Sequence, residues 1–267
     1  MKRIICQTED SMRLRFTIPF LLTAIGVIMA AESPFVGKWK LNPAKSQFAG
    51  TTTTYEQLPS GEMQMTAEGQ SYKFKVDGKD YPAIFGATAA WKQVDPNNWE
   101  VTNKFDGKAL STDTIKIAAD GKTMTVASKG KKPNGESYEE SAALQRVSGG
   151  PGLPGNWKST KVQPTTEMWE ITPNGDDGLT MTVVDYNASA KVKFDGKDYP
   201  VTGPTIPKNF TLTIKKTSPR SLEMTEKMDG KVVFIDMFTV SADGKTLSDE
   251  AAAPGSNEKV KVVYDKQ

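Results

Sequence analysis

Hydrophobic and polar residues alternate with a period of two in short segments along most of the chain. Phe74 and Val76 alternate with lysines in one segment, and Ile115 and Ile117 alternate with Thr and Lys in another. A period of two sends successive side chains to opposite faces of a β-strand, one toward a core and one toward water. Beyond the first 31 residues no segment sustains a helical apolar stripe. The pattern therefore predicts an all-β protein.

Asp-Gly pairs punctuate these segments at positions 77–78, 106–107, 120–121, 195–196, 229–230 and 243–244. Asp-Gly is a strong hairpin signal because glycine tolerates the positive φ that tight turns require. Strands and turns together predict about eight to ten short antiparallel strands per copy of an internal repeat. Such a series closes into an up-and-down β-barrel or, alternatively, packs as a β-sandwich.

The internal repeat organises the chain. Gly-Lys-Trp-Lys at 37–40 recurs as Gly-Asn-Trp-Lys at 155–158, and the block 73–82 recurs at 191–200 with the same offset of 118. Ala-Asp-Gly-Lys-Thr at 119–123 recurs at an offset of 123, which implies a net insertion of five residues in the second copy. Matched blocks in the same order predict two tandem domains of one kind.

Glycine and proline crowd the region between the copies, at 149–155. Residues at this density do not continue a strand or a helix, so this stretch is the expected linker. We therefore expect one β-barrel repeat at 32–148 and a second at 151–267, each able to fold alone.

The N-terminal 31 residues have the features of an extension followed by a secretory signal. Arg13 and Arg15 precede an apolar run at 16–29, and Ala30 and Ala31 offer small residues for cleavage. An uncleaved N-terminal anchor is the alternative. The only cysteine, Cys6, precedes the apolar run. We therefore expect export to the periplasm or outside the cell, and a mature chain with no disulfide and no stable membrane anchor.

Charge and missing residue types narrow the function. The net charge of the whole chain is +2, all of which belongs to the expected leader, so the mature part is about neutral and nucleic acid is not an expected partner. The chain has no histidine, which excludes Ser-His-Asp and Cys-His nucleophiles and histidine-ligated zinc. We find no phosphate-binding loop or dinucleotide fingerprint, and expect no cofactor and no metal.

Two carboxylate pairs receive a structural interpretation. Glu139 and Glu140 are adjacent in an expected strand and so point to opposite faces. Asp176 and Asp177 lie in a glycine-rich stretch that fits a polar turn better than a calcium loop. The sequence thus shows no catalytic constellation, although an enzyme that uses paired carboxylates stays an alternative.

The Gly-x-Trp at the start of each copy resembles the opening motif of lipocalins and their calycin relatives. The whole repeat unit, through Asp-Gly-Lys-Asp-Tyr-Pro to Asp-Gly-Lys-Thr, resembles uncharacterised secreted lipocalin-like proteins of bacteria. The resemblance implies that Trp39 and Trp157 plug the closed ends of two barrels. It also implies a late basic residue over each plug: Arg146 over Trp39 in the first copy, and Lys259, Lys261 or Lys266 in the second.

The block Asp-Gly-Lys-Asp-Tyr-Pro, at 77–82 and 195–200, allows two interpretations. It is either a repeated structural corner or a place where Tyr81 and Tyr199 meet a ligand at a barrel mouth. Other interior positions are expected either to fill a core or to line a cavity. They are Phe74, Val76, Trp91, Trp99, Phe105, Ile115, Ile117, Val192, Phe194, Phe210, Leu212, Ile214, Met224 and Phe234. The candidate ligand contacts among all of these are Tyr81, Tyr199, Trp91, Trp99, Phe105 and Phe210.

The favoured function is an exported binding protein that holds a small apolar ligand in one or both barrels. The alternative is a structural or interaction protein of the cell envelope with filled barrels and no ligand. Cavity volume separates the two, because a ligand site needs several hundred Å³.

Overall fold

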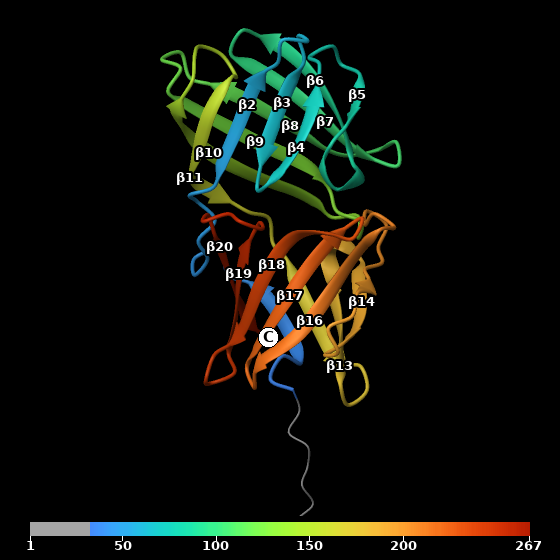
Figure 1. Cartoon of the computed structure of the whole chain (residues 1–267). Coiled ribbons are helices and arrows are strands. Elements are labelled where there is room, and N and C mark those ends of the chain that lie inside the picture. The colour runs from blue at the N-terminus through green and yellow to red at the C-terminus, as the bar shows by residue number, and fades with distance from the viewer. Residues whose placement is uncertain (1–32) are drawn as a thin grey trace, which may run out of the picture. The chain divides into compact units, whose positions relative to one another are not determined.

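The computed structural model describes residues 33–267, which form two ten-stranded antiparallel sheets, each curved into a nearly closed barrel (Figure 1). The all-β class and the two tandem barrels predicted from the sequence are thus confirmed. The expected leader at 1–31 and Cys6 lie outside the described residues. Within residues 33–267 no helix is long and apolar enough to cross a membrane.

Barrel 1 contains ten strands that follow one another along the chain, with a short 3-10 turn, η1 (Ile84–Gly86), after the fourth. The sheet runs from β4 through β3, β2, β11, β10, β9, β8, β7 and β6 to β5, so its only unpaired edges are β4 and β5. The strands are β2 (Thr52–Gln57), β3 (Met63–Ala67), β4 (Gln70–Phe74), β5 (Asp80–Pro82), β6 (Thr88–Asp95), β7 (Asn98–Phe105), β8 (Lys108–Ile117), β9 (Thr123–Lys131), β10 (Ser137–Ser148) and β11 (Gly155–Gln163).

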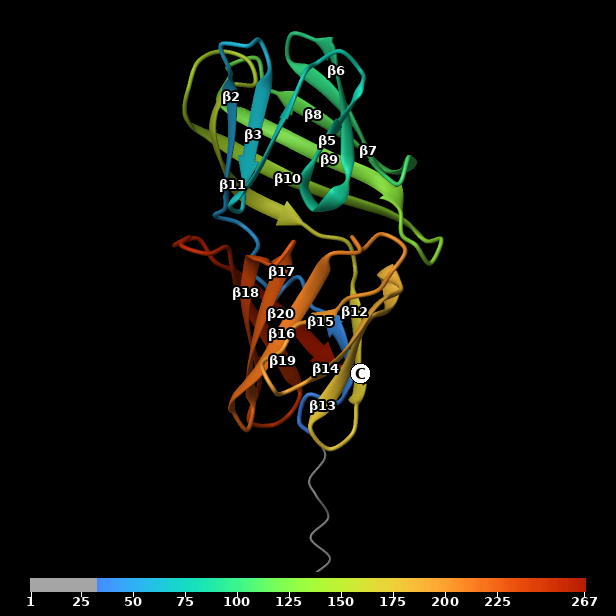
Figure 2. The same ribbon diagram turned by 45° about the vertical axis from the view of Figure 1, so that its right-hand side comes forward.

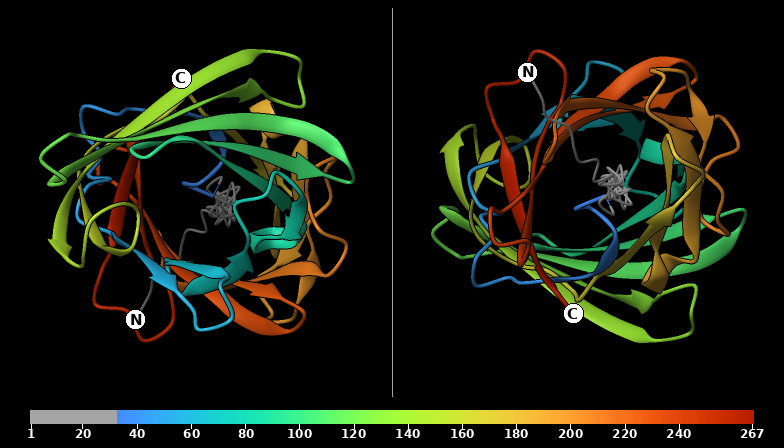
Figure 3. Two further views of the ribbon diagram at one scale, coloured as in Figure 1. Left: turned by 90° about the horizontal axis from the view of Figure 1, so that it is seen from above. Right: turned by 90° about the horizontal axis from the view of Figure 1, so that it is seen from below.

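Barrel 2 contains the first strand of the chain and the last nine, with a second 3-10 turn, η2 (Val184–Tyr186). Its sheet runs from β14 through β13, β12, β1, β20, β19, β18, β17 and β16 to β15. The strands are β1 (Gly37–Leu41), β12 (Met168–Pro173), β13 (Gly178–Val183), β14 (Ala188–Lys193), β15 (Tyr199–Pro200), β16 (Phe210–Ser218), β17 (Ser221–Met228), β18 (Lys231–Val240), β19 (Thr246–Ala252) and β20 (Val260–Lys266). In both end-on views the strands curve around a central axis (Figure 3).

The barrels are offset by one strand from the sequence repeats. β11, which opens the second repeat, pairs with β10 and β2 of the first repeat. β1, which opens the first repeat, pairs with β12 and β20 of the second. Figure 2 shows this blue N-terminal strand among the yellow and red strands of barrel 2. Each barrel is therefore completed by the Gly-x-Trp strand of the other repeat.

This offset changes the role of the expected linker. The stretch at 149–154 joins β10 to β11 inside barrel 1, and its Leu153 belongs to the core of that barrel. The chain instead passes between the barrels at 42–51 and at 164–167. Barrel 1 is thus the continuous segment 52–163, rather than 32–148, and barrel 2 is discontinuous.

The two motif tryptophans are fully buried. The Nε1 of Trp157 donates to the Leu153 carbonyl at 2.9 Å, and the Nε1 of Trp39 donates to the Phe35 carbonyl at 2.7 Å. The strand offset also corrects the expected cap, because Arg146 stacks at 3.9 Å on Trp157 and not on Trp39. Lys266 takes the corresponding place over Trp39, at 5.1 Å from the ring centre.

The position of the Arg146 side chain explains why the Gly-x-Trp motif requires glycine. Its guanidinium donates hydrogen bonds to the carbonyls of Gly121, Gly152 and Pro154, at 2.6, 2.6 and 2.8 Å. Gly155 has a φ of +140°, and a Cβ there would stand 2.9 Å from the guanidinium and 2.4 Å from the Ser148 carbonyl oxygen. Only glycine allows this approach, because it has no Cβ.

Two of the repeated Asp-Gly pairs form hairpin turns, and two others form corners between strands. Asp106-Gly107 and Asp229-Gly230 have positive φ at both residues and form two-residue hairpin turns, as predicted. The pairs at 77–78 and 195–196 instead turn a corner between strands that do not pair with each other.

Because β4 ends at Phe74, Val76 is 36% exposed and its predicted interior position is wrong. The predicted insertion of five residues lies at the start of β16: Thr211 takes the place of Thr88 in the strand register, so 201–210 replaces the shorter 83–87.

The strand offset predicts which fragments fold. A fragment of residues 52–163 holds every strand of barrel 1, so we expect cooperative unfolding and a β-type circular dichroism spectrum. A fragment of 168–267 lacks β1 and leaves β12 and β20 as unpaired edges. We expect it to be markedly less stable and to gain stability when a peptide of residues 33–42 is added, as in strand complementation. A 52–163 fragment that is unfolded under native conditions would contradict the offset.

The buried tryptophans provide a second test. Trp39→Ala and Trp157→Ala should each cost about 3–5 kcal/mol, the range for large aromatic residues in cores. We expect each substitution to destabilise mainly the strands of the other repeat, because each tryptophan lies in the barrel that the other repeat forms. Hydrogen exchange followed by mass spectrometry should show faster exchange in β12–β20 for Trp39→Ala, and in β2–β10 for Trp157→Ala. Faster hydrogen exchange in the repeat that carries the substitution would show that each Gly-x-Trp strand belongs to the barrel of its own repeat.

Candidate functional site

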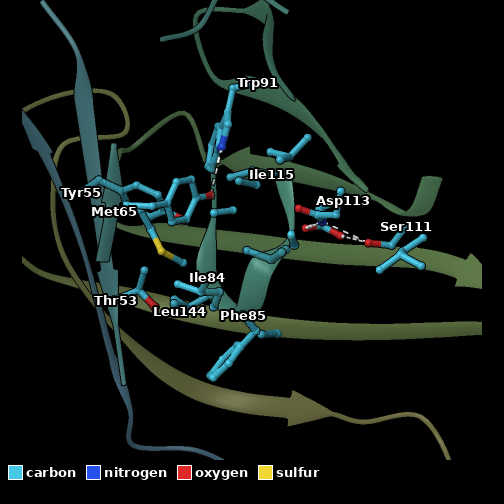
Figure 4. Close-up of a pocket in the computed structure, with 18 of the residues that line it drawn as sticks. Thr53, Tyr55, Met65, Ile84, Phe85, Trp91, Ser111, Asp113, Ile115 and Leu144 are labelled. Atoms are coloured by element: carbon cyan, nitrogen blue, oxygen red, sulfur yellow. Dashed lines mark hydrogen bonds between the residues drawn. The ribbon is translucent and has the colours of Figure 1, made fainter. Parts of the chain in front are cut away.

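Barrel 1 contains a cavity of about 570 Å³. Side chains from strands on all sides of the barrel line it, among them Tyr55, Met65, Trp91, Ile115 and Leu144 (Figure 4). On β11 the inward side chains after Trp157 are Ser159 and Val162, and both line the cavity. The space therefore begins beyond the buried tryptophan along this strand. The turn η1 contributes Ile84 and Phe85 to the wall.

One side of the cavity is aromatic. Trp91 stacks on Phe74 with ring centres 4.1 Å apart and meets Tyr55 edge-on at 5.9 Å. The Nε1 of Trp91 donates to the Tyr72 hydroxyl oxygen at 3.1 Å. Burial raises the pKa of Tyr72 to about 12 and that of Tyr55 further, so both phenols are neutral at physiological pH. This wall offers flat apolar surface with little exposed polarity.

A polar cluster lies on another side of the same cavity. The Asp113 carboxylate accepts hydrogen bonds from Asn103 Nδ2 at 2.7 Å and from Ser128 Oγ at 2.6 Å. Ser111 Oγ lies 3.4 Å from the same carboxylate and itself accepts from Asn103 Nδ2 at 3.0 Å. Figure 4 shows Asp113 and Ser111 together on the side of the cavity away from Tyr55. A carboxylate held partly away from water needs such donors, and neutral side chains supply them to the half-buried Asp113.

Two further residues extend this polar side. Tyr138 of β10 also lines the cavity, and a second hollow of about 410 Å³, which shares Ser111, Asp113 and Tyr138 with it, adds Glu140. Burial and the nearby Asp113 raise the pKa of Glu140. Glu139, the next residue, is exposed and pairs with Lys129 at 2.8 Å, so the two glutamates point to opposite faces, as predicted. The cavity is thus apolar on one side and acidic on the other.

The structure brings only some predicted ligand residues to this cavity. Trp91 and Phe105 line it. Trp99 is buried near Met63 and Leu153, where it lines a separate shallow hollow. Phe210 is half-buried at the start of β16 in barrel 2.

Tyr81 and Tyr199 make matching contacts in the two barrels. The hydroxyl of each donates at 3.0 Å to an aspartate four residues earlier, Asp77 or Asp195. The second oxygen of each aspartate accepts the backbone N–H of Lys79 or Lys197, both at 3.1 Å. These hydrogen bonds support the interpretation of the block as a repeated structural corner.

Sequence reasoning missed the polar cluster. Asp113 stands two residues before Ile115, on the strand face that was assigned to the core, and Asn103 stands two residues after the buried Val101. A polar residue that keeps the inward phase of a strand was the available signal. It was not used because the alternation was followed only through apolar residues.

Barrel 2 carries a different set of residues at the equivalent positions. Asp236 lies 123 residues after Asp113 and takes the same place in the strand register, opposite Met224 and Ala251. The three residues that bond Asp113 are replaced by residues without a matching donor: Asn103 by Glu226, Ser111 by Phe234 and Ser128 by Ala251. Within the described part of the chain, Asp236 Oδ2 has no hydrogen-bond partner. Barrel 2 thus has a carboxylate at the equivalent position but none of the three donors that hold it in barrel 1.

Acidic side chains gather around Asp236. Asp236 and Glu226 both line a second cavity, of about 480 Å³. Burial raises the pKa of Asp236, and the carboxylates of Asp249 and Glu226 raise it further. Burial likewise raises the pKa of Glu226 and of Asp249. The interior of barrel 2 therefore favours protonated carboxyl groups.

Comparisons with models of protein families, with curated proteins and with solved structures found no match. The function proposed below therefore depends on the geometry of the two barrels.

The raised pKa values predict how stability depends on pH. A carboxyl group with a higher pKa in the folded state binds protons more tightly when folded, so stability falls as the pH rises above the ordinary value of about 4. We expect lower stability at about pH 8 than at about pH 5. Asp236→Asn should remove part of this decrease and stabilise the protein by about 1–3 kcal/mol at the higher pH.

Denaturant melts at both pH values measure the effect. Glu139→Gln is the matched control, because Glu139 is an exposed residue of β10 that pairs with Lys129 at 2.8 Å and lies outside the acidic group of barrel 2. Surface aspartates with lowered pKa, such as Asp265, change stability only below this pH window. Equal melts for the wild type at the two pH values would contradict the prediction.

Proposed function

We propose that this protein is an exported binding protein that holds a small, mostly apolar ligand inside barrel 1. The cavity of about 570 Å³ carries the proposal, because it lies within the range of known small-molecule sites. A filled barrel, as the envelope-protein alternative requires, would have no connected space of this size. Export is inferred from the expected leader at 12–31.

The walls indicate the shape and polarity of the ligand. Tyr55, Trp91 and Phe105 provide aromatic surface for a flat or branched apolar body. Asn103, Ser111 and Tyr138 provide polar atoms on the opposite side. A ligand with one polar end and an apolar body satisfies both walls, since a few polar groups orient a ligand in an otherwise apolar pocket.

Filling the cavity tests this proposal. Ala142 on β10 lines the cavity, whereas the neighbouring Ala143 alternates to the outer face of the strand. We expect the neutral fluorescent probe N-phenyl-naphthylamine to bind the wild-type protein and gain fluorescence. Ala142→Phe should weaken probe binding by about tenfold or more by occupying the space, and the matched Ala143→Phe should leave it within about twofold.

Thermal melts of both variants confirm that they are folded. Organic extraction and mass spectrometry of protein from its native host would identify a bound molecule directly. If neither the probe nor any extracted molecule binds, or if both alanine variants bind the probe as the wild type does, the ligand site in barrel 1 is disproved.

A further inference from the structure

The acidic interior of barrel 2 has unsatisfied hydrogen-bonding capacity. Asp236 is 5% exposed and Asp249 is 9% exposed, yet Asp236 Oδ2 and Asp249 Oδ1 have no hydrogen-bond partner among the described residues. Asp236 lines the cavity of about 480 Å³. Buried polar atoms are nearly always paired, so two orphaned carboxylate oxygens in one region require an explanation.

The neighbouring groups supply no compensating cation. The carboxylates that act on Asp236 and Asp249 come from β17 and β19 and from the segment before β12: Glu226, Asp249, Glu250 and Glu167. Glu167 Oε1 already accepts hydrogen bonds from Trp169 Nε1 at 2.7 Å and from the Tyr264 hydroxyl at 2.8 Å. The titratable groups around the orphaned oxygens therefore carry no positive charge.

Three lysines of the surrounding strands are engaged elsewhere, and Lys231 of β18 is exposed to solvent. Lys227 of β17 pairs with Asp198 at 2.6 Å, and Lys261 of β20 pairs with Glu250 at 3.6 Å. Lys266 of β20 lies over the Trp39 ring. A cation that neutralises the interior therefore has to come from outside the chain.

The rest of the cavity identifies the kind of cation. Apolar side chains line much of it: Phe234, Ala251, Ala252, Ala253, Val260 and Val262. Glu68 and Glu258 add two further carboxylates to the lining, so the negative groups are spread along the cavity. Within residues 33–267 no group of three or more acidic, His or Cys side chains is placed to hold a metal ion. Spread charges with apolar surface between them suit a long organic cation better than a compact ion.

We propose that the carboxylate-lined cavity where barrel 2 meets the β3–β4 turn of barrel 1 binds an aliphatic diamine or polyamine. One ammonium group would donate hydrogen bonds to Asp236 and Glu226, and the methylene chain would lie along Phe234, Val260 and Val262. A second ammonium would meet Glu68, in that turn, or Glu258. The cavity adjoins that of barrel 1, because Thr51 lines both and Phe234 stacks on Phe85 at 6.1 Å, but the proposal does not rest on a ligand in barrel 1.

Amines of graded charge test the proposal on the whole protein. Isothermal titration calorimetry at about pH 8 should show saturable binding of spermidine and cadaverine, weaker binding of pentylamine and none of pentanol. Affinity should fall as the pH decreases toward 5, because the carboxyl groups protonate while an aliphatic amine keeps its charge. Glu226→Gln and Asp236→Asn should each weaken cadaverine binding by about tenfold or more.

Two matched controls separate this site from general attraction to an acidic surface. Glu139→Gln removes the same charge from an exposed position on β10, and Asp113→Asn makes the equivalent change in barrel 1. Both should leave cadaverine affinity within about twofold of the wild type. The proposal is overturned if no diamine binds the folded protein, if pentanol binds as well as cadaverine, or if Glu139→Gln weakens binding as much as Asp236→Asn.

Discussion

The pairing of the Gly-x-Trp strand on both of its sides is the constraint on which the rest of this structure depends. A barrel strand without a neighbour exposes a row of unpaired backbone groups. β11 satisfies β10 and β2, and β1 satisfies β20 and β12. The same two strands carry the buried tryptophans, so closure of each sheet and burial of its tryptophan in the core occur together. The basic caps, Arg146 and Lys266, pack over those tryptophans from the neighbouring strand.

The two barrels also form an internal comparison, because one sequence unit has been used twice. Strand register and the Trp plug are kept, while the interior layer above them has diverged. In barrel 1 a carboxylate is held by an amide and two hydroxyl groups. In barrel 2 the equivalent carboxylate faces other carboxylates and apolar side chains. A common scaffold thus supports two cavities of different chemistry, which is how small antiparallel barrels commonly differ in function.

The sequence alone was sufficient for the repeat, the strands and the hairpin turns, because alternation and Asp-Gly pairs are local signals. It could not reveal which repeat supplies each Gly-x-Trp strand. The segments 37–40 and 155–158 are so alike that no local pattern tells which barrel each strand belongs to. Their placement is decided by the short connections at 42–51 and 164–167, whose geometry no local pattern encodes. Asp113 and Asn103 were missed for another reason, since a polar residue on an inward face contradicts the rule that identifies that face.

The strand order also constrains the sequence of folding events. β2–β11 are consecutive, so barrel 1 has all its strands once residue 163 has been synthesised. Barrel 2 joins β1 to β20, residues at opposite ends of the described chain, through the register of Trp39 with Lys266. Closing so long a loop is slow compared with forming hairpins. While barrel 1 is already complete, β1 can pair with β12 soon after β11 has been made, but its other edge must stay unpaired until Lys266 of β20 has followed, more than a hundred residues after β11. During that interval its near-copy, β11, already occupies the only competing place in barrel 1, and this keeps the two similar strands from exchanging partners.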